Sequence, residues 1–252
     1  MLSIVPIPIL KDNYVWLLHA HGHAAVVDPG EAAPVLVALA ERGLQLDAIL
    51  LTHHHGDHTG GVAALRDATA CMVYGPASLA LVDRPLAAGA TLALPGLRAS
   101  FAVMAVPGHT LDHLAYHGEG RLFCGDTLFA CGCGRLFEGT PAQMQASLAQ
   151  LAALPPSTEV YCTHEYTLSN QRFALAVEPD NAALQRRAQA DAARRNVGQP
   201  TVPFRLADEL ACNPFLRWGQ PAVQAAARQH GAQSDAPVEV FAALRRWKDR
   251  FA

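Results

Sequence analysis

The sequence lacks any apolar run of the roughly 20 residues that a membrane-spanning helix needs. Its apolar N-terminus, MLSIVPIPILKDNYVW, has no basic leader and no small-residue cleavage site, and two prolines interrupt it. We therefore expect this segment to be the first strand of the fold and not a secretion signal, and we expect no association with a membrane.

The sequence also lacks a cysteine pair with CxxC spacing, although it holds six cysteines. In the absence of an export signal, we expect free thiols in a reducing cytoplasm. Cys131 and Cys133 in FACGCGR could indicate metal binding, but a tight glycine turn flanked by small residues is the favoured interpretation.

A surplus of basic charge is absent too, because the formal net charge is −3. This balance argues against a general nucleic-acid binder. The sequence has no GxSxG motif, so it offers no obvious serine nucleophile. With 51% hydrophobic and 16% charged residues, the chain of 252 residues can bury a sizeable core, and disorder is not expected.

Short apolar runs alternate with helical stretches over the first two thirds of the chain. YVWLLHA and HAAVVDPG predict a hairpin, and EAAPVLVALAERGL predicts a helix ending at Gly43. TPAQMQASLAQLAAL predicts a helix with Thr140 as N-cap and Pro141 at its first position, and a further helical stretch covers residues 60–68. Further strands are expected in LDAILLTH, CMVYGP, ASFAVMAVPGH, HLAYHG, RLFCGDT and EVYCTHEY. This mixture indicates a layered α/β domain.

The composition changes after Tyr166. Residues 170–196 are rich in alanine and arginine with helical periodicity, a short helix is expected at 206–210, and two last helices are broken at 231–237. We therefore place a domain boundary near residue 168 and expect residues 169–252 to form a helical domain.

The stretch LLTHHHGDHTGG follows an apolar run and combines imidazoles with a carboxylate. In an extended chain His53 and His55 point to one side, and His54 points to packing or solvent on the other. Asp57 and His58 are expected where the chain turns toward a helix beginning near Gly60. Neutral imidazole and carboxylate are the ligands expected of Zn²⁺, Fe or Mn. The earlier cluster HAHGH is interpreted as a chance surface cluster at a hairpin turn.

Three further segments place a candidate ligand at the end of an apolar run: VPGHTLDH, LFCGDT and VYCTHEY supply His109, Asp126 and His164. Asp28 in VVDPG is expected to be a structural or outer partner of the ligands and not a ligand itself. His113, His117 and His230 do not follow the end of an apolar run in this way. We expect them to support the ligands from outside or to lie at the surface.

THHHGDH, GHT, GDT and HEYT, in that order, resemble the metal-binding motifs of the metallo-β-lactamase superfamily over nearly the whole chain. GDTLFACGCGRLFEGTPAQM, THEYTLSNQRFALAVEPDN, PTVP, NPFLR and the terminal RRWKDRF resemble, more narrowly, its hydroxyacylglutathione hydrolase (glyoxalase II) family. The resemblance implies an α/β fold, a metallo-β-lactamase-like αββα sandwich followed by a smaller α-helical C-terminal domain. Residues 1–168 would form the metallo-β-lactamase-like catalytic domain, and residues 169–252 the helical substrate-binding domain.

The resemblance also implies a site with two divalent metal ions, zinc in the first place and iron or manganese as alternatives. One ion would be held by His53, His55 and His109. The other would be held by Asp57, His58 and His164, with Asp126 and a water or hydroxide bridging both. Asp57 and Asp126 would then be the catalytic residues. The substrate contacts implied are Arg135, Phe137, Tyr166, Arg245 and Lys248.

The activity implied is hydrolysis of the thioester S-D-lactoylglutathione, and of related 2-hydroxyacylglutathiones, to glutathione and D-lactate by a metal-bridged hydroxide. This reaction is the second step of methylglyoxal detoxification. A thioester suits such a site, because a thiol with a pKa near ~8.5 leaves as thiolate without a general acid. The expected protein is a cytoplasmic monomer acting on a small molecule, with no nucleic-acid partner.

The sequence departs from the family pattern at three positions. Arg135 stands where many members have lysine, Phe137 where a tyrosine often lies, and Asp112 where glycine is usual. Alternative hypotheses are a persulfide dioxygenase, a lactonase, a β-lactamase or a processing nuclease of the same superfamily. A further alternative is a metal-binding scaffold without catalysis, although structural zinc sites are usually rich in cysteine.

Overall fold

The computed structural model describes residues 2–251. Contacts within the chain divide them into two compact units, residues up to 105 with 112–125, and residues 106–111 with 126 onward. The chain therefore passes from one unit to the other three times. The division into these units does not test the predicted domain boundary near residue 168, which stays a prediction.

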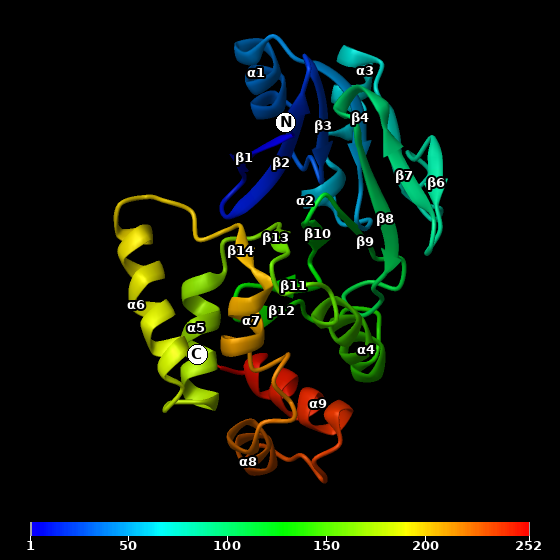
Figure 1. Ribbon diagram of the computed structural model, residues 1–252. Coiled ribbons are helices and arrows are strands. Elements are labelled where there is room, and N and C mark those ends of the chain that lie inside the picture. The colour runs from blue at the N-terminus through cyan, green and yellow to red at the C-terminus, as the bar shows by residue number, and fades with distance from the viewer. Residues whose placement is uncertain (1, 252) are drawn as a thin grey trace. The chain divides into compact units, whose positions relative to one another are not determined.

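The first sheet of the first unit follows the chain in order, β1-β2-β3-β4-β5-β6 (Figure 1). Its strands are β1 (Ser3–Ile9), β2 (Asn13–Ala20), β3 (His23–Val27), β4 (Gln45–Leu50), β5 (Met72–Pro76) and β6 (Arg84–Leu86). The first three are antiparallel neighbours, and β3 to β6 pair in parallel. The expected first strand and the hairpin are confirmed, with His21 and Gly22 at positive φ in the turn.

Two helices follow strands of this sheet, as parallel pairing requires. They are α1 (Ala33–Arg42) and α3 (Val62–Thr69). Helix α1 ends as predicted, because Gly43 adopts the left-handed conformation at φ 61° that glycine tolerates without strain. Side chains of both helices share one buried cluster with one face of the sheet, including Val15, Val35, Ile49 and Leu65.

A second set of strands in this unit runs antiparallel in the order β7-β8-β9-β10. These are β7 (Thr91–Leu94), β8 (Ala99–Ala105), β9 (Leu114–Gly118) and β10 (Arg121–Gly125), with a 3₁₀ turn η1 (Pro95–Leu97) between the first two. Ala99, Phe101 and Val103 of β8 are buried and alternate with more exposed residues, which gives the strand one inward face. The buried Tyr116 hydroxyl donates to the Leu51 carbonyl, so this set packs against the first sheet.

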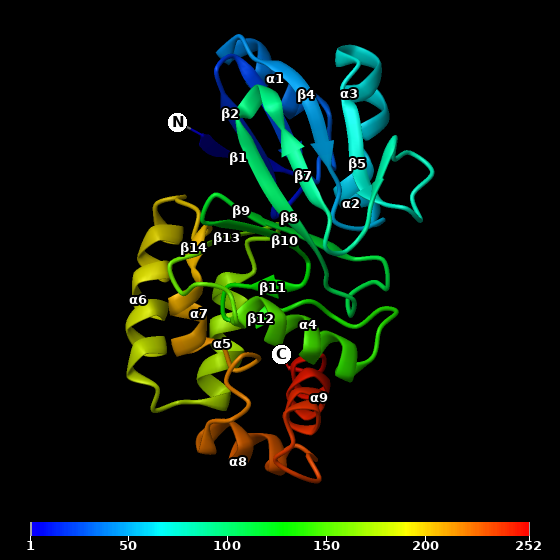
Figure 2. The ribbon, with the colours of Figure 1, turned by 45° about the vertical axis from the view of Figure 1, so that its right-hand side comes forward.

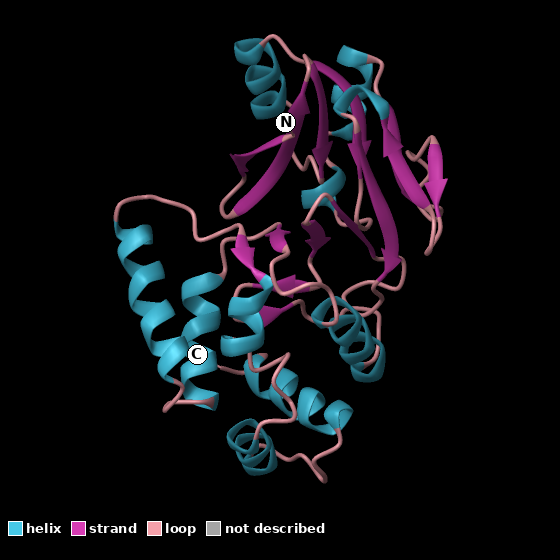
Figure 3. Ribbon diagram, viewed as in Figure 1, coloured by secondary structure: helices cyan, strands magenta, loops and turns pink. Residues whose placement is uncertain are grey.

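The second unit is mainly helical (Figure 3). Its helices are α4 (Pro141–Ala152), α5 (Thr167–Val177), α6 (Ala182–Asn196), α7 (Leu206–Cys212), α8 (Pro221–Gln229) and α9 (Pro237–Lys248). Two short strand pairs accompany them: β11 (Leu128–Phe129) with β12 (Gly132–Cys133), and β13 (Glu159–Cys162) with β14 (Phe204–Arg205).

The predicted helix starts and breaks in this unit are largely confirmed. Thr140 caps α4 in a reciprocal capping box with Gln143, and Pro141 is its first residue. The helical periodicity over 170–196 divides into two helices, since Pro179 cannot extend α5 and the Asn181 side chain caps α6. The short helix runs two residues beyond its predicted end, to Cys212.

Within residues 2–251, no helix has both the length and the apolar character needed to cross a membrane.

Candidate metal centre

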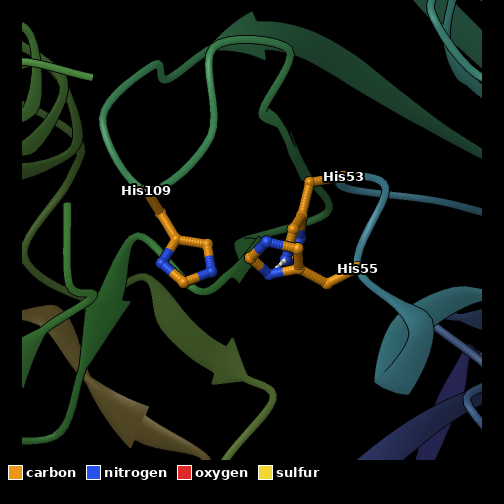
Figure 4. A group of neighbouring side chains, drawn as sticks. All are labelled: His53, His55 and His109. Atoms are coloured by element: carbon orange, nitrogen blue, oxygen red, sulfur yellow. Dashed lines mark hydrogen bonds between the residues drawn. The ribbon is translucent and has the colours of Figure 1, made fainter. Parts of the chain in front are cut away.

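His53 and His55 form a pair directly after β4. Nε2 of His53 lies 3.1 Å from Nδ1 of His55, and the dashed line in Figure 4 marks this contact. The His53 ring is fully buried and stacks on His113, with ring centroids 4.6 Å apart. The prediction that both histidines point to one side is therefore confirmed, and the expected secondary role of His113 agrees with its position behind His53.

His54 points away from this pair. Its ring is 40% exposed, and its Nδ1 lies 3.1 Å from Oδ2 of Asp112. The Ser78 hydroxyl donates to the same carboxylate oxygen over 2.7 Å. Asp112, which departs from the family pattern, therefore holds His54 in place between the predicted ligands His53 and His55.

Asp57 and His58 lie directly before a helix near Gly60, as the sequence suggested, since α3 begins at Val62. The sequence did not predict that they form a short helix of their own, α2 (Gly56–Thr59), which begins after His55 in extended conformation. Nε2 of His58 lies 3.5 Å from Oδ2 of Asp57, and the Asn13 amide donates to that oxygen over 3.0 Å. One helical turn therefore presents a carboxylate and an imidazole together.

Asp28 supports this arrangement from behind. Its carboxylate accepts from the Thr52 backbone N–H over 2.8 Å and from the Thr52 hydroxyl over 2.7 Å, and its Oδ2 lies 3.1 Å from Nδ1 of His58. A carboxylate at Nδ1 keeps the proton there and leaves Nε2 able to bind a metal. Asp28 thus contacts a predicted ligand, as expected, and its role as an outer partner of a metal site stays a prediction.

The second unit supplies a set of donors centred on Asp126. Nε2 of His109 and Nε2 of His164 each lie 3.4 Å from Oδ2 of Asp126. Nδ1 of His109 lies 2.9 Å from the Arg135 carbonyl, which places the proton on Nδ1 and leaves Nε2 for a ligand. Figure 4 shows His109 on its loop after β8. The three predicted ligands of this unit thus share one cluster.

Aromatic rings fix the last of these ligands. His164 stacks on Tyr166 with a centroid separation of 4.5 Å and an interplanar angle of 7°. Phe129 meets the edges of both rings. Tyr166 is 38% exposed and reaches solvent from this stack. A predicted substrate contact, Tyr166, therefore stacks directly on a predicted metal ligand, His164.

The donor chemistry of both sets fits divalent metal ions. In the first unit the ligand atoms of His53 and His55, of His53 and His58, and of Asp57 and His58 lie within 4.8 Å of each other. Buried imidazoles and carboxylates are costly unless they are paired or bind a cation. The six cysteines are free and buried, and none belongs to these clusters, which argues against a closed structural zinc site.

The predicted substrate contacts differ in exposure. The Arg135 side chain is 65% exposed and Phe137 is 63% exposed. Arg245 is only 4% exposed, so the helix end is not simply solvated. Its guanidinium donates to the Cys133 carbonyl over 3.1 Å and to Asp249 over 2.8 Å.

Lys248 lies one helical turn beyond Arg245, and its ammonium donates to the Ser169 carbonyl over 3.3 Å. Burial, and secondarily the positive charge of Arg245, lower the pKa of Lys248 to about 8. Asp249 bonds Arg245 and lies 3.8 Å from Nε of Arg135.

Sequence reasoning did not single out Asp249 or Asn13. The i,i+4 spacing from Arg245 could have indicated Asp249. No local signal indicates Asn13, which meets Asp57 from a different strand.

Two family models match adjoining parts of the chain, which together span residues 10–251. Residues 10–164 match the model of the metallo-beta-lactamase superfamily, and residues 165–251 match the model described as hydroxyacylglutathione hydrolase C-terminus. The first match covers strands β2 to β13 and the candidate ligands, and the second covers helices α5 to α9. Together they confirm the fold class predicted from the sequence.

Curated relatives match over the full length. A hydroxyacylglutathione hydrolase of Methylobacillus flagellatus is 55% identical over 253 residues and covers 100% of both chains. One of Alkalilimnicola ehrlichii is 58% identical over 256 residues and covers 99% of this chain and 100% of its own. Among solved structures, TTHA1623 in a di-iron-bound form is 30% identical with a TM-score of 0.55, over 64% of this chain and 91% of its own.

Proposed function

The chain belongs to the hydroxyacylglutathione hydrolase family of the metallo-beta-lactamase superfamily, and we propose that it hydrolyses S-D-lactoylglutathione and related 2-hydroxyacylglutathiones. The products would be glutathione and D-lactate or the corresponding 2-hydroxy acid. The observation that carries this proposal is the full-length match to hydrolases of that name, including the helical segment from residue 165. That segment also favours this function over a persulfide dioxygenase or a lactonase.

For the metal centre, we propose that each donor pair of the first unit is completed by one residue of the second. His53 and His55 would hold one ion with His109, and Asp57 and His58 would hold the other with His164. Asp126 would bridge both ions. The proposal is supported by the pairing of donors after β4 and by the central position of the Asp126 carboxylate between His109 and His164.

Zinc is the first choice of metal, with iron or manganese as alternatives, because imidazole and carboxylate ligands accept all three. Such ions would lower the pKa of a shared water and would stabilise the oxyanion that develops on a thioester carbonyl.

The protein's own groups position the reactants. Asn13 holds the Asp57 carboxylate by its amide, so that Asp57 can orient the attacking water and accept its proton. The leaving thiol needs no proton donor, because its pKa is near ~8.5. Phe137 meets the His109 ring edge to face, with centroids 5.2 Å apart, so the exposed Phe137 surface would guide the acyl end of the substrate toward that ligand.

Glutathione carries two carboxylates, so its binding site should present cationic side chains. We propose that Arg135, Arg245 and Lys248 form the cationic contact surface for the tripeptide, with Tyr166 and Phe137 beside it. Asp249 bonds Arg245 and lies near Arg135. It therefore holds these two cations in place while lowering their net charge.

Metal analysis coupled to thioester turnover tests this function. The purified protein should contain divalent metal, lose lactoylglutathione hydrolysis on treatment with a chelator, and regain it on reloading. Persulfide-dependent oxygen uptake, measured in parallel, should stay at background. A metal-loaded protein that consumes oxygen with persulfide, or that does not cleave the thioester, would show that the proposal is wrong.

We further propose that the protein works in the cytoplasm as a monomer. The six buried free thiols support a reducing compartment. Size-exclusion chromatography with light scattering tests the oligomeric state.

A further inference from the structure

The second unit contains a cavity of about 480 Å³ that the proposed reaction does not use. It lies between α6 on one side and β13, β14 and α7 on the other, and Figure 2 shows α6 standing beside β14 and α7. Its volume is within the range of sites for small molecules. None of the predicted metal ligands or tripeptide contacts lines it.

Helix α6 turns one face to the cavity. Arg187, Asp191 and Arg194 follow at helical spacing, and Arg186 lies beside them. Arg187 and Asp191 are already engaged: Arg187 pairs with the fully buried Glu209, and Asp191 accepts from the Gln171 amide over 2.6 Å. These two residues therefore line the cavity in positions that other side chains hold in place.

Arg186 and Arg194 differ from Arg187. Both side chains are exposed, and within residues 2–251 the guanidinium of neither makes a hydrogen bond or an ion pair. A guanidinium presents a planar fork of donors that matches a carboxylate in two-point contact. The α6 side of the cavity therefore offers two guanidinium groups that can bind carboxylates.

The opposite side carries acidic groups. Glu159 begins β13 and accepts a hydrogen bond from the Tyr161 hydroxyl over 3.0 Å. Asp208 lies in the first turn of α7 and is exposed. Arg205 is the cross-strand partner of Glu159 and adds one cation to this side. Because guanidiniums and carboxylates face each other across the cavity, a ligand of a single charge sign would be repelled by one side.

We propose that this cavity binds a small zwitterion with two carboxylates and one ammonium, of the amino-acid or short-peptide class. The carboxylates would contact Arg186 and Arg194, and the ammonium would contact Asp208 and Glu159. The ring of Phe204, over which Arg187 lies at 5.4 Å, supplies the apolar floor for the aliphatic part of the ligand.

Isothermal titration of the metal-loaded, full-length protein with the dipeptide L-alanyl-L-glutamate tests this inference. Two matched probes remove one charge each: the N-acetylated dipeptide has no ammonium, and L-alanyl-L-glutamine has one carboxylate fewer. Each should bind about tenfold more weakly, because a hydrogen-bonded ionic contact is lost. Equal affinity of the three peptides, or no binding of the first, would overturn the proposal.

Variants locate the binding. Arg194→Gln and Arg186→Gln should each weaken binding of alanylglutamate about tenfold, and Asp208→Asn should weaken it while leaving the N-acetylated peptide unaffected. Arg172→Gln, on α5 and outside the cavity lining, is the matched control. Hydrolysis of lactoylglutathione should be unchanged in the cavity variants, since they lie outside the metal centre. Binding that survives Arg194→Gln and Arg186→Gln together belongs elsewhere and would refute the assignment.

Discussion

Oδ2 of Asp28 lies 3.1 Å from Nδ1 of His58, and both side chains are almost completely removed from solvent. The same carboxylate accepts two hydrogen bonds from Thr52, the residue directly before the His53 pair. One buried acid thus ties together the two stretches that carry the donors of the first unit. We expect Asp28 to set the orientation and the tautomer of the His58 imidazole, which determine how well an imidazole binds a metal.

Asp28→Asn should therefore weaken metal retention about 10–100-fold. An amide can donate to Nδ1 of His58, which would shift the proton of the ring to Nε2, the atom needed for the ion. Competition with a chromophoric chelator measures the affinity, and circular dichroism checks the fold. Asp47→Asn is the matched control, because Asp47 meets His23 over 2.8 Å in the histidine cluster interpreted as incidental. Equal loss in both variants would contradict a specific role for Asp28.

Asp112 is expected to stabilise the loop between the two predicted ligands. Asp112→Gly removes the contacts with His54 and Ser78 together and should lower the free energy of unfolding by about 1 kcal/mol. Urea denaturation measures the change. Ser78→Ala removes only one of these contacts and should cost less. If glycine at position 112 leaves both stability and metal retention unchanged, the contact with His54 has no energetic role.

The affinity for the substrate should depend on pH through Lys248. Its pKa is about 8, lowered first by burial, so the ammonium carries its charge below that pH and loses it above. KM for lactoylglutathione should therefore rise as pH increases through about 8, while kcat changes less. Lys248→Arg keeps its charge over this range and should remove the rise. A KM profile that is the same in both proteins would exclude Lys248 as a carboxylate contact.

The sequence predicted those features that depend on local chemistry. The alternation of side chains along an extended chain predicted that His53 and His55 lie on one side. The capping residues Thr140 and Gly43 predicted the start of α4 and the end of α1. The position of Asp57 and His58 in α2 was missed, because a helix of four residues leaves no periodicity to detect.

Features that join distant segments were not predictable. Asn13 meets Asp57 over 44 positions of the chain, and Arg245 meets the Cys133 carbonyl over 112. Arg245 shows the physical reason most clearly. A basic residue at a helix end looks solvated in sequence, yet the fold buries it on a carbonyl that only tertiary packing supplies.

Glu209 provides the last test, because it connects the packing of the helical segment to the residues that follow the predicted ligand Asp126. It is fully buried, pairs with Arg187, and accepts from the backbone N–H of Cys131 and from the Asn213 amide, each over 2.8 Å. Glu209→Ala would leave Arg187 buried without its main counter-charge and should cost about 3–5 kcal/mol of unfolding free energy in urea.

The double variant Arg187→Leu with Glu209→Leu should lose less stability than Glu209→Ala, because it leaves no uncompensated charge. It still removes the acceptor for Cys131, which lies in the turn between β11 and β12 a few residues after Asp126. Metal retention should therefore stay weakened in the double variant even where stability recovers. Chelator competition and urea denaturation on the same protein separate the two effects. Full recovery of both would mean that Glu209 acts through charge balance alone and has no part in holding the segment that carries Asp126.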